Sequence, residues 1–452
     1  MTTPSATLPS GYIRMPMTGR RVRGIQAASL FHTLMQDFFG EDDGTTYVQT
    51  GDIPAMWLRD SSAQTLPYIR FLAGFPALRP RVAGVIERNA RNILTDPYAN
   101  AFQADYHVWE RKWEIDSLSF PITLVWTYWK TTGDTTIFTD ALHHALRTIV
   151  QTYRCEQHHS TCRRYEYPYR VSTIERYQDT GMIWAAFRPS DDPVHYRFNI
   201  PQETFAAVTL QCIAAIAREA YGDLQLAGDA TQVADEVVRG ILRYGVVFAP
   251  GHGWMYAYEV DGLGDALLAD DANLPNLVGL PLAQWCSPFD PEYLITRDFA
   301  LSDDDPYYFR GAYAAGIGSE HTPAGFVWPL GILTRALTST SQAEIAESIT
   351  TLAETASNEG LIHESFNAGG YWEFTRQEFG WANALWAELV FRSLAGFPGN
   401  SLTPEDTVML PFERPAATPA LVPLIVQMEN GGEIVAALAD LLEAEDQNPN
   451  RR

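Results

Sequence analysis

One acidic segment has the composition expected of a proton donor. Residues 188–192 (RPSDD) place Asp191 and Asp192 beside Arg188 in a turn-rich stretch before a helical region. Hydrolysis of a glycosidic bond needs a protonated carboxyl group for the leaving oxygen and a second carboxylate that activates water or attacks the sugar. Two adjacent aspartates do not normally straddle a sugar, so the second group is expected from a distant loop. A solvated Asp-Asp turn is the alternative interpretation.

A second segment supplies a suitable partner. Residues 361–366 (LIHESF) follow Gly360, a common helix stop, so Glu364 is expected in a loop. His363 and Phe366 flank this glutamate, in positions to orient and partly desolvate its carboxylate. A surface glutamate or a helix-cap contact is the competing interpretation.

The densest cluster of polar and aromatic residues lies in residues 51–64 (GDIPAMWLRDSSAQ). It contains the following candidates for a wall that binds sugar hydroxyls: Asp52, Trp57, Arg59, Asp60 and Gln64. Arginine and aspartate form charge-assisted hydrogen bonds with hydroxyl groups. A helix is expected to start near Ser61, and Asp60 or Ser61 serving only as its N-cap is the structural alternative.

Metal and cofactor sites find little support. Asp270, Asp271 and residues 303–305 are acidic enough for calcium but lack an EF-hand loop. The group Cys155, His158, His159 and Cys162 lacks the usual zinc spacings. The sequence contains no Walker loop, dinucleotide fingerprint, GxSxG or HExxH motif. We therefore predict no metal and no cofactor.

Taken together, six segments resemble glycoside hydrolase family 125, the exo-α-1,6-mannosidases. They are GDIPAMWLRDSSAQ (51–64), ERKWEIDSLSFPI (110–122), FRPSDD (187–192), DDANLPNL (270–277), GIGSEHTPAGFVWPL (316–330) and HESF (363–366). Their order is preserved over roughly residues 20–395. The version at 318–325 departs from the compact glycine-rich form expected, which affects the sites beyond the terminal mannose.

The resemblance implies an all-α (α/α)6 barrel and metal-independent, inverting release of terminal α-1,6-linked mannose from oligosaccharides or N-glycan fragments. It places the general acid within Asp191 and Asp192, with Asp191 favoured, and the general base on Glu364. Inversion leaves room for a water, with carboxyl groups about 6.5–9.5 Å apart. The residues that it implies for substrate binding are Trp57, Arg59, Asp60, Glu114, Asp116, Arg188, Asn273, His321, Trp328 and His363.

The acid must stay protonated near neutral pH. Burial or the neighbouring aspartate is expected to raise its pKa, and Arg188 to act in the opposite direction.

The elements that position these residues are predicted to be mainly helical. Apolar residues recur at helical spacing at 30–38, 205–216, 233–244 and 345–352, while 253–260 (GWMYAYEV) is the best strand candidate. Long Gly-, Pro- and Asp-rich connections between the helices suggest a toroid whose loops converge on one pocket. We expect a catalytic domain over 1–396 and, over 397–452, a linker or surface wrap ending in a helix at 433–445 that offers a route to self-association.

Composition limits the partners. A net charge of −23 over 452 residues opposes binding to nucleic acid or anionic membranes and favours neutral α-mannosides. The N-terminus lacks the apolar stretch of a secretory signal, and four cysteines are too few for a disulfide framework, so we expect reduced cysteines and cytoplasmic residence. A non-catalytic mannoside-binding protein, or another sugar-active toroid enzyme such as a phosphorylase or epimerase, is the alternative function.

Overall fold

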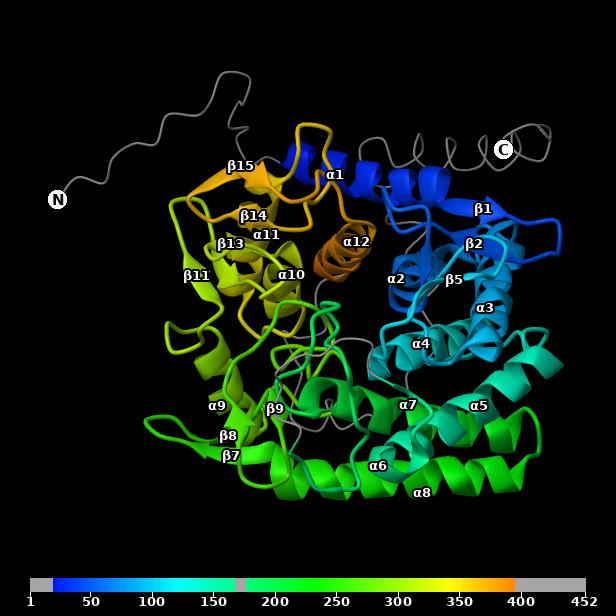
Figure 1. Cartoon of the computed structure of the whole chain (residues 1–452). Coiled ribbons are helices and arrows are strands. Elements are labelled where there is room, and N and C mark those ends of the chain that lie inside the picture. The colour runs from blue at the N-terminus through cyan, green and yellow to red at the C-terminus, as the bar shows by residue number, and fades with distance from the viewer. Residues whose placement is uncertain (1–18, 167–175, 395–452) are drawn as a thin grey trace.

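The described residues, 19–166 and 176–394 of the computed structural model, are mostly helical, as predicted, and Figure 1 shows the helices arranged around a common centre. The α-helices are α1 (Gly19–His32), α2 (Leu58–Thr65), α3 (Leu78–Thr95), α4 (Ile115–Thr132), α5 (Asp140–Glu156), α6 (His159–Cys162), α7 (Ile200–Glu219), α8 (Leu224–Gly240), α9 (Pro291–Ala300), α10 (Pro329–Leu337), α11 (Gln342–Thr355) and α12 (Gly380–Leu394). The expected tail over 397–452, with its helix, lies outside the described residues.

Inner and outer helices differ in how much of their surface is buried. The inner helices contact one another in the sequence α10, α12, α2, α4 and α7, and all eight residues of α2 are buried. α3, α5, α8 and α11 bury one face only, and they pack outside: α8 against α7, and α11 against α10. Helices that are buried all round belong in a core, and amphipathic ones belong at its surface. This is the layering of an (α/α)6 toroid.

The apolar α7 illustrates the inner layer. Its length and mean hydropathy of 1.2 are also those of a membrane-spanning helix, but 89% of that window is buried inside the structure. Its contacts with α4, α5 and α8 account for this burial. The apolar residues of α7 therefore form part of the toroid core.

Helix boundaries follow local capping chemistry. The side chains of Thr139, Asn199 and Ser341 accept hydrogen bonds from the first turns of α5, α7 and α11. The expected start of a helix near Ser61 is three residues late, because extended backbone at Trp57 leads directly into α2 at Leu58. Asp60 consequently lies inside the first turn and is not the N-cap residue.

Short antiparallel strands form at the connections between helices. They are β1 (Phe38–Gly40), β2 (Thr46–Val48), β3 (Met56–Trp57), β4 (Ala101–Phe102), β5 (Val108–Glu110), β6 (Phe198–Asn199), β7 (Val246–Ala249), β8 (Gly253–Tyr256), β9 (Glu259–Val260), β10 (Ala266–Leu267), β11 (Tyr308–Arg310), β12 (Ala315–Ile317), β13 (Phe326–Val327), β14 (Phe366–Asn367) and β15 (Gly370–Phe374). The predicted strand at 253–260 becomes β8 and β9, which join different sheets. The sheets have two or three strands and brace loops.

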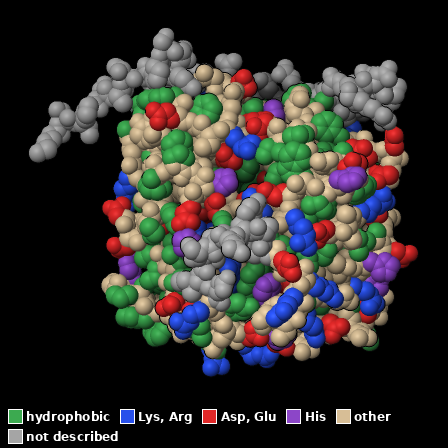
Figure 2. Space-filling model, viewed as in Figure 1, with side chains coloured by type: hydrophobic (Ala, Val, Ile, Leu, Met, Phe, Trp, Pro, Cys, Tyr) green, Lys and Arg blue, Asp and Glu red, His purple; other side chains and the backbone are tan. Residues whose placement is uncertain are grey.

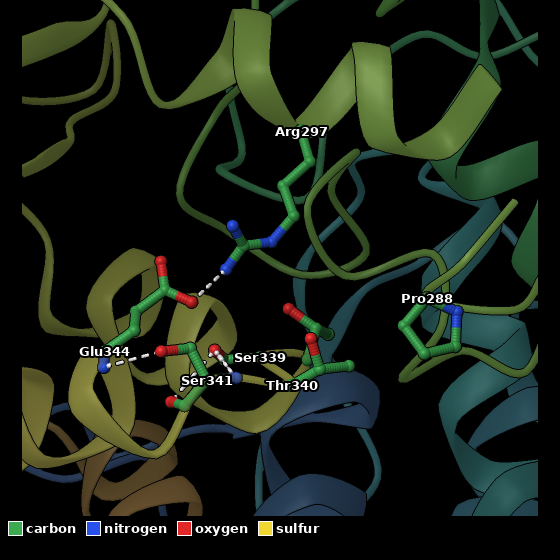
Figure 3. Close-up of a pocket in the computed structure, with 7 residues that line it drawn as sticks. Pro288, Arg297, Ser339, Thr340, Ser341 and Glu344 are labelled. Carbon is green, nitrogen blue, oxygen red and sulfur yellow. Dashed lines mark hydrogen bonds and ion pairs between the residues drawn. The ribbon is translucent and has the colours of Figure 1, made fainter. Parts of the chain in front are cut away.

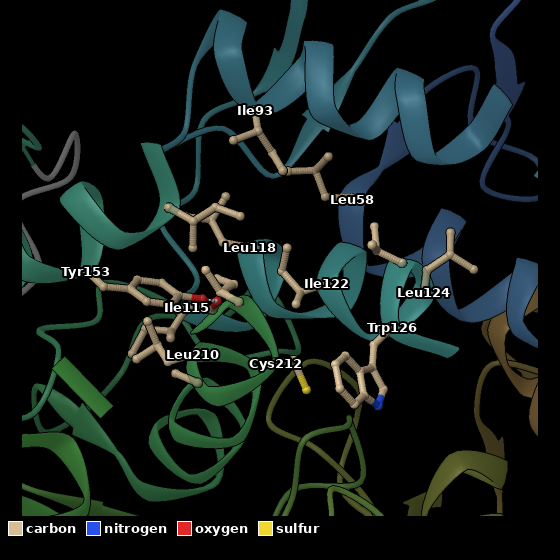
Figure 4. Packing of buried hydrophobic residues seen from close by; sticks show 14 of the residues in the cluster. Leu58, Ile93, Ile115, Leu118, Ile122, Leu124, Trp126, Tyr153, Leu210 and Cys212 are labelled. Atoms are coloured by element: carbon tan, nitrogen blue, oxygen red, sulfur yellow. Dashed lines mark hydrogen bonds between the residues drawn. The ribbon is translucent and has the colours of Figure 1, made fainter. Parts of the chain in front are cut away.

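Aliphatic and aromatic side chains fill the space between the two helical layers. Figure 4 shows Leu58 and Ile93 facing Leu118 and Ile122 of α4 in one part of this core. Near the centre of the toroid, the ring of Phe120 meets that of Phe205 at 4.9 Å and that of Trp381 at 5.6 Å. These contacts join α4 to α7 and to α12.

A disulfide corrects the expectation that the cysteines stay reduced. Cys155 at the end of α5 is bonded to Cys162 at the end of α6, with their Cα atoms 5.5 Å apart. The turn between α5 and α6 brings these residues to ordinary disulfide distance, which sequence spacing alone did not reveal. Cys212 and Cys286 are free. The inference from reduced cysteines to a reducing compartment therefore loses its basis.

Candidate active site

Arg59 is the centre of a buried charge cluster. From the first turn of α2, its guanidinium donates to Glu114 at 2.7 Å, to Asp116 at 3.2 Å and to Asp191 at 3.1 Å. Its Nε lies 3.4 Å from Asp60. The structure thus brings together predicted residues from three distant segments.

Hydrogen bonds between backbone and side chains fix the segments that carry these acids. Gln202 of α7 accepts from the backbone amides of Ile115 and Asp116 and donates to the carbonyl of Phe187. The carbonyl of Trp113 accepts from the amide of Phe187. The start of α4 and the segment before Asp191 are therefore tied to each other.

The cluster holds more negative than positive charge, and this shifts its pKa values. Burial, with the charge of Asp191 adding to it, raises the pKa of Glu114 far above its ordinary value. Burial also raises the pKa of Asp116, to about 6, although Arg59 opposes the shift. For Asp191, burial is outweighed by Arg59, by a hydrogen bond with Glu114 and by Lys112, so its pKa is lowered. The hydrogen-bonded pair of Glu114 and Asp191 therefore retains a proton, held mainly by Glu114.

Asp60 has the features of a hydroxyl-binding residue. Burial raises its pKa to about 6 against the effect of Arg59, and the charges of Asp191 and Glu364 add to the increase. Its Oδ2 is buried without a hydrogen-bond partner, as is the indole nitrogen of Trp57 nearby in the chain. Buried polar atoms are normally paired, so these two are suited to hydrogen bonds with a bound sugar.

The two adjacent aspartates point to different surroundings. Asp191 contacts the Arg59 cluster, whereas Asp192 accepts from Ser190 at 2.9 Å and faces Nδ1 of His321 at 3.3 Å. Asp191 has a φ of +66°, a left-handed conformation uncommon outside glycine. The tight turn, closed by the amide of Arg188 on the carbonyl of Asp192, holds this conformation. Such backbone strain is concentrated at functional sites.

The guanidinium of Arg188 pairs with carboxylates other than Asp191 and Asp192, which corrects the expected effect of Arg188 on the pKa of the acid. Its Nε donates to Glu259 at 2.6 Å and its Nη1 to Glu320 at 2.9 Å. Arg59 is the guanidinium that lowers the pKa of Asp191. Positions three residues apart in a turn face different directions, so chain proximity was misleading.

Glu364 is held by a hairpin. It lies two residues before β14, and β14 pairs with β15 so that the chain returns beside it. Thr375 donates to one carboxylate oxygen at 2.7 Å and Arg376 to the other at 3.1 Å. Arg376 also pairs with Asp52, which connects this hairpin to the 51–64 segment. Glu364 is only 8% exposed, so the surface-glutamate alternative is wrong.

Two histidines expected at the site have different roles. His321 faces Asp192, and its pKa is raised first by that hydrogen bond and then also by the charges of Asp191 and Glu364. His363 instead stacks on Phe374 and hydrogen-bonds the carbonyl of Arg376. His363 therefore supports the hairpin, and Thr375 and Arg376 are the side chains that orient Glu364.

Trp328 and Asn273 brace neighbouring loops. The indole of Trp328 donates to Thr322 at 2.9 Å. Asn273 is bound to Asp271, which also accepts from Ser319. Both residues thus lie next to the loop that carries His321.

The acidic residues weighed for calcium cap turns. Asp270 accepts from the amides of Leu277 and Val278, and Asp305 accepts from the amide of Asp270. Asp303 and Asp304 pair with Arg310 and His252.

The residues weighed for zinc are also engaged. Among the described residues, one group of metal-ligand side chains comes close together, formed by Cys155, Glu156 and Cys162, and its sulfurs are joined in the disulfide. His159 pairs with Glu156 and stacks on Trp184. His158 faces Asp179.

The segments that carry Asp191 and Glu364 come near the same residues. Asp191 and Glu364 both influence the pKa values of Asp60 and His321, although they come from separate elements. Figure 2 shows a hollow in the middle of one face, rimmed by acidic, basic and histidine side chains. A separate cavity of about 300 Å³ lies near Arg297 and Glu344 (Figure 3) and is lined by none of the residues of these clusters.

Sequence reasoning missed Thr375, Arg376 and Glu320. The segment AGG at 368–370 is a turn signal, and the aromatic run after it suggests a returning strand. A hairpin centred there places residues 375–376 opposite Glu364. For Glu320 the sequence carries no comparable signal, because two of its partners, Arg188 and His195, come from a distant segment.

Paired carboxyl clusters in the loops of an (α/α)6 toroid define a sugar-active enzyme class, and comparison with solved structures supports the fold. A bacterial glucoamylase bound to acarbose matches with a TM-score of 0.54 and 14% identity, over 81% of this chain and 52% of that one. Residues 25–391 match the sequence model of the metal-independent α-mannosidases, GH125. The chain belongs to this family.

Two relatives share a third of their residues with the chain. A metal-independent α-mannosidase from Streptococcus pneumoniae, solved in a non-productive complex with α-1,6-mannobiose, matches with a TM-score of 0.81 and 34% identity, over 84% of this chain and 95% of that one. The meiotically up-regulated gene 157 protein of Schizosaccharomyces pombe is 34% identical in an alignment of 395 positions that covers 78% of this chain and 77% of that protein.

Proposed function

We propose that this α-mannosidase family member is an exo-acting, inverting α-1,6-mannosidase that releases terminal mannose from oligosaccharides or N-glycan fragments. The observation that carries the proposal is that Asp191 and Glu364, on separate loops, are both joined to the 51–64 segment: Asp191 through Arg59, and Glu364 through Arg376 and Asp52. The mannobiose complex of the Streptococcus pneumoniae relative supports the linkage.

Asp191, paired with Glu114, is proposed as the general acid. As the C1–O bond breaks, the proton held by Glu114 passes to Asp191 across their hydrogen bond, and Asp191 passes it on to the leaving oxygen, which leaves both carboxylates without a proton. Asp192 is the less suitable donor because it is engaged by Ser190 and by His321, whose pKa is raised by that contact.

Glu364 is proposed as the general base. It removes a proton from a water that attacks C1 on the face opposite the leaving oxygen, so that mannose leaves as the β anomer. Thr375 and Arg376 hold both oxygens of Glu364 and fix the direction of this proton transfer. The proton then passes to solvent, and the pair of Asp191 and Glu114 regains one.

The deciding experiment follows the first-formed anomer from α-1,6-mannobiose by proton NMR with EDTA present. β-Mannose supports the proposal. α-Mannose contradicts inversion, and binding without turnover favours a mannoside-binding protein. A requirement for phosphate indicates a phosphorylase.

The two aspartates are separated by Asp191→Asn and Asp192→Asn on aryl mannosides with good and poor leaving groups. The acid variant loses less activity on the good leaving group, because that group departs with little protonation. If Asp192→Asn shows this pattern and Asp191→Asn does not, the acid is Asp192.

A further inference from the structure

The loop at 318–325 is a fixed wall of the site. It connects β12 to β13, and it is the stretch in which this sequence departs from its family pattern. Ser319 donates to the buried Asp271 at 2.6 Å, and Thr322 accepts from Trp328 at 2.9 Å. Both contacts are to buried partners, so the loop has a defined position.

One side of this loop adjoins the acid. Glu320 accepts from Nη1 of Arg188 at 2.9 Å, and His321 faces Asp192 at 3.3 Å. Two consecutive loop residues therefore contact both ends of the RPSDD turn.

The other side of the loop leads to the base. β13, which follows the loop, pairs with β14, so that Val327 lies opposite Phe366, two residues after Glu364. His321 is influenced by both Asp191 and Glu364. The loop thus spans the interval between acid and base.

Glu320 has the chemistry of a hydroxyl acceptor. Its Oε2 is engaged by Arg188 and by His195 at 3.2 Å, while its Oε1 accepts the hydroxyl of Tyr307. The hydrogen bond from His195, together with Tyr307 and Arg188, lowers the pKa of Glu320 to about 2. One third of its side chain remains exposed, at 33%. A carboxylate has about four acceptor positions, so capacity remains for a ligand.

The position of the general acid indicates which part of the substrate lies near Glu320. A general acid must reach the oxygen of the leaving group, so the leaving group lies on the acid side of the cleaved bond. Glu320 is tied to the acid turn through Arg188. We propose that Glu320 binds the leaving-group sugar through its hydroxyls and selects a neutral, hydroxylated aglycone. This inference rests on the proposed hydrolase function.

Binding measurements test the inference without turnover. In the Glu364→Gln protein, calorimetry compares mannose with α-1,6-mannobiose, with and without Glu320→Ala. We expect the second substitution to weaken mannobiose binding at least tenfold and at least five times more than mannose binding. Equal effects on both ligands, or no effect on mannobiose, overturn the inference. If the wild-type protein cleaves no mannoside, the proposed function fails while this comparison still decides the role of Glu320.

Kinetics with the conservative Glu320→Gln variant provide the second measurement. We expect kcat/KM for α-1,6-mannobiose to fall at least tenfold more than kcat/KM for an aryl α-mannoside, whose leaving group lacks sugar hydroxyls. Parallel losses show that Glu320 acts on the acid through Arg188, which overturns the inference. Glu344→Gln is the matched control, because Glu344 also accepts from two arginines, Arg297 and Arg335, at a partly buried position elsewhere. It must leave the substrate ratio unchanged.

Discussion

At the acid end of the site, Arg59 stands among four carboxyl groups, whereas at the base end Arg376 serves Glu364 and the exposed Asp52. The first cluster is almost entirely buried, with Glu114 and Asp116 at 0% exposure. One guanidinium and the nearby Lys112 do not neutralise four buried carboxylates. Protons are therefore retained at this end.

The base end uses hydrogen bonds for a different purpose. A hydroxyl and a guanidinium each donate to one oxygen of Glu364, which fixes its orientation toward a water. The difference indicates how one protein assigns opposite roles to chemically similar groups: surplus buried charge retains a proton, and paired donors orient an acceptor.

The largest expected effect comes from removing the centre of the acid end. Arg59→Met leaves several buried carboxyl groups without a cation, and we expect the free energy of unfolding to fall by about 3–5 kcal/mol. Urea denaturation at pH 7 measures this, with activity expected to be lost as well. Arg91→Met is the control, since Arg91 pairs with Glu87 and Asp43 at a half-exposed surface position and should cost about 0–1 kcal/mol. Equal losses in both variants contradict the central role of Arg59.

The second prediction concerns Glu364, the proposed base. Glu364→Gln keeps the shape of the side chain but does not accept a proton from water, so kcat should fall by about 10²–10⁴ on every α-mannoside, good leaving groups included. Glu373→Gln, on the adjacent β15 and bonded to Asn367, is the control. A fully active Glu364→Gln protein shows that another group is the base.

The sequence predicted the candidate residues better than it predicted their contacts. The helical toroid is confirmed, and the structure places Arg59 of the 51–64 segment against Glu114 and Asp116, a contact that was not predicted. Helical periodicity carries the fold, because it is a local property, whereas Glu114 and Asp116 were implied by the resemblance to the family.

The contacts that the sequence did not predict depend on how separate segments of the chain pack together. Arg188 turned from its neighbour Asp191 to Glu259, seventy-one positions away, and Arg376 reached Glu364 through a hairpin. Cys155 and Cys162 met only because α5 and α6 turn. None of these pairings follows from spacing in the chain.

The pH dependence of stability tests whether Asp60, in the buried cluster around Arg59, holds a proton more tightly in the folded state. Its pKa rises from the ordinary 3.8 to about 6 on folding, so the folded state binds more protons than the unfolded state between these values. The free energy of unfolding therefore falls as pH rises through about 4–6, and Asp60 contributes a loss of about 3 kcal/mol above this window. In Asp60→Asn this part of the pH dependence should disappear. Urea denaturation at pH 4, 5, 6 and 7 measures the difference, and parallel curves for the two proteins contradict it.

The smallest expected effect comes from a variant that changes the orientation of the Glu364 carboxylate and leaves the carboxylate itself in place. Arg376→Gln removes the donor to Oε1 of Glu364 while the Thr375 hydroxyl still holds Oε2, so the carboxylate is retained but less well directed. We expect kcat to fall by about tenfold, because a misplaced catalytic group lowers the rate even when substrate still binds. KM should change little, since the residues proposed to bind mannose lie around Arg59. Arg310→Gln, which breaks an exposed pair with Asp303, is the control. If KM rises while kcat is unchanged, Arg376 binds the sugar and does not position the base.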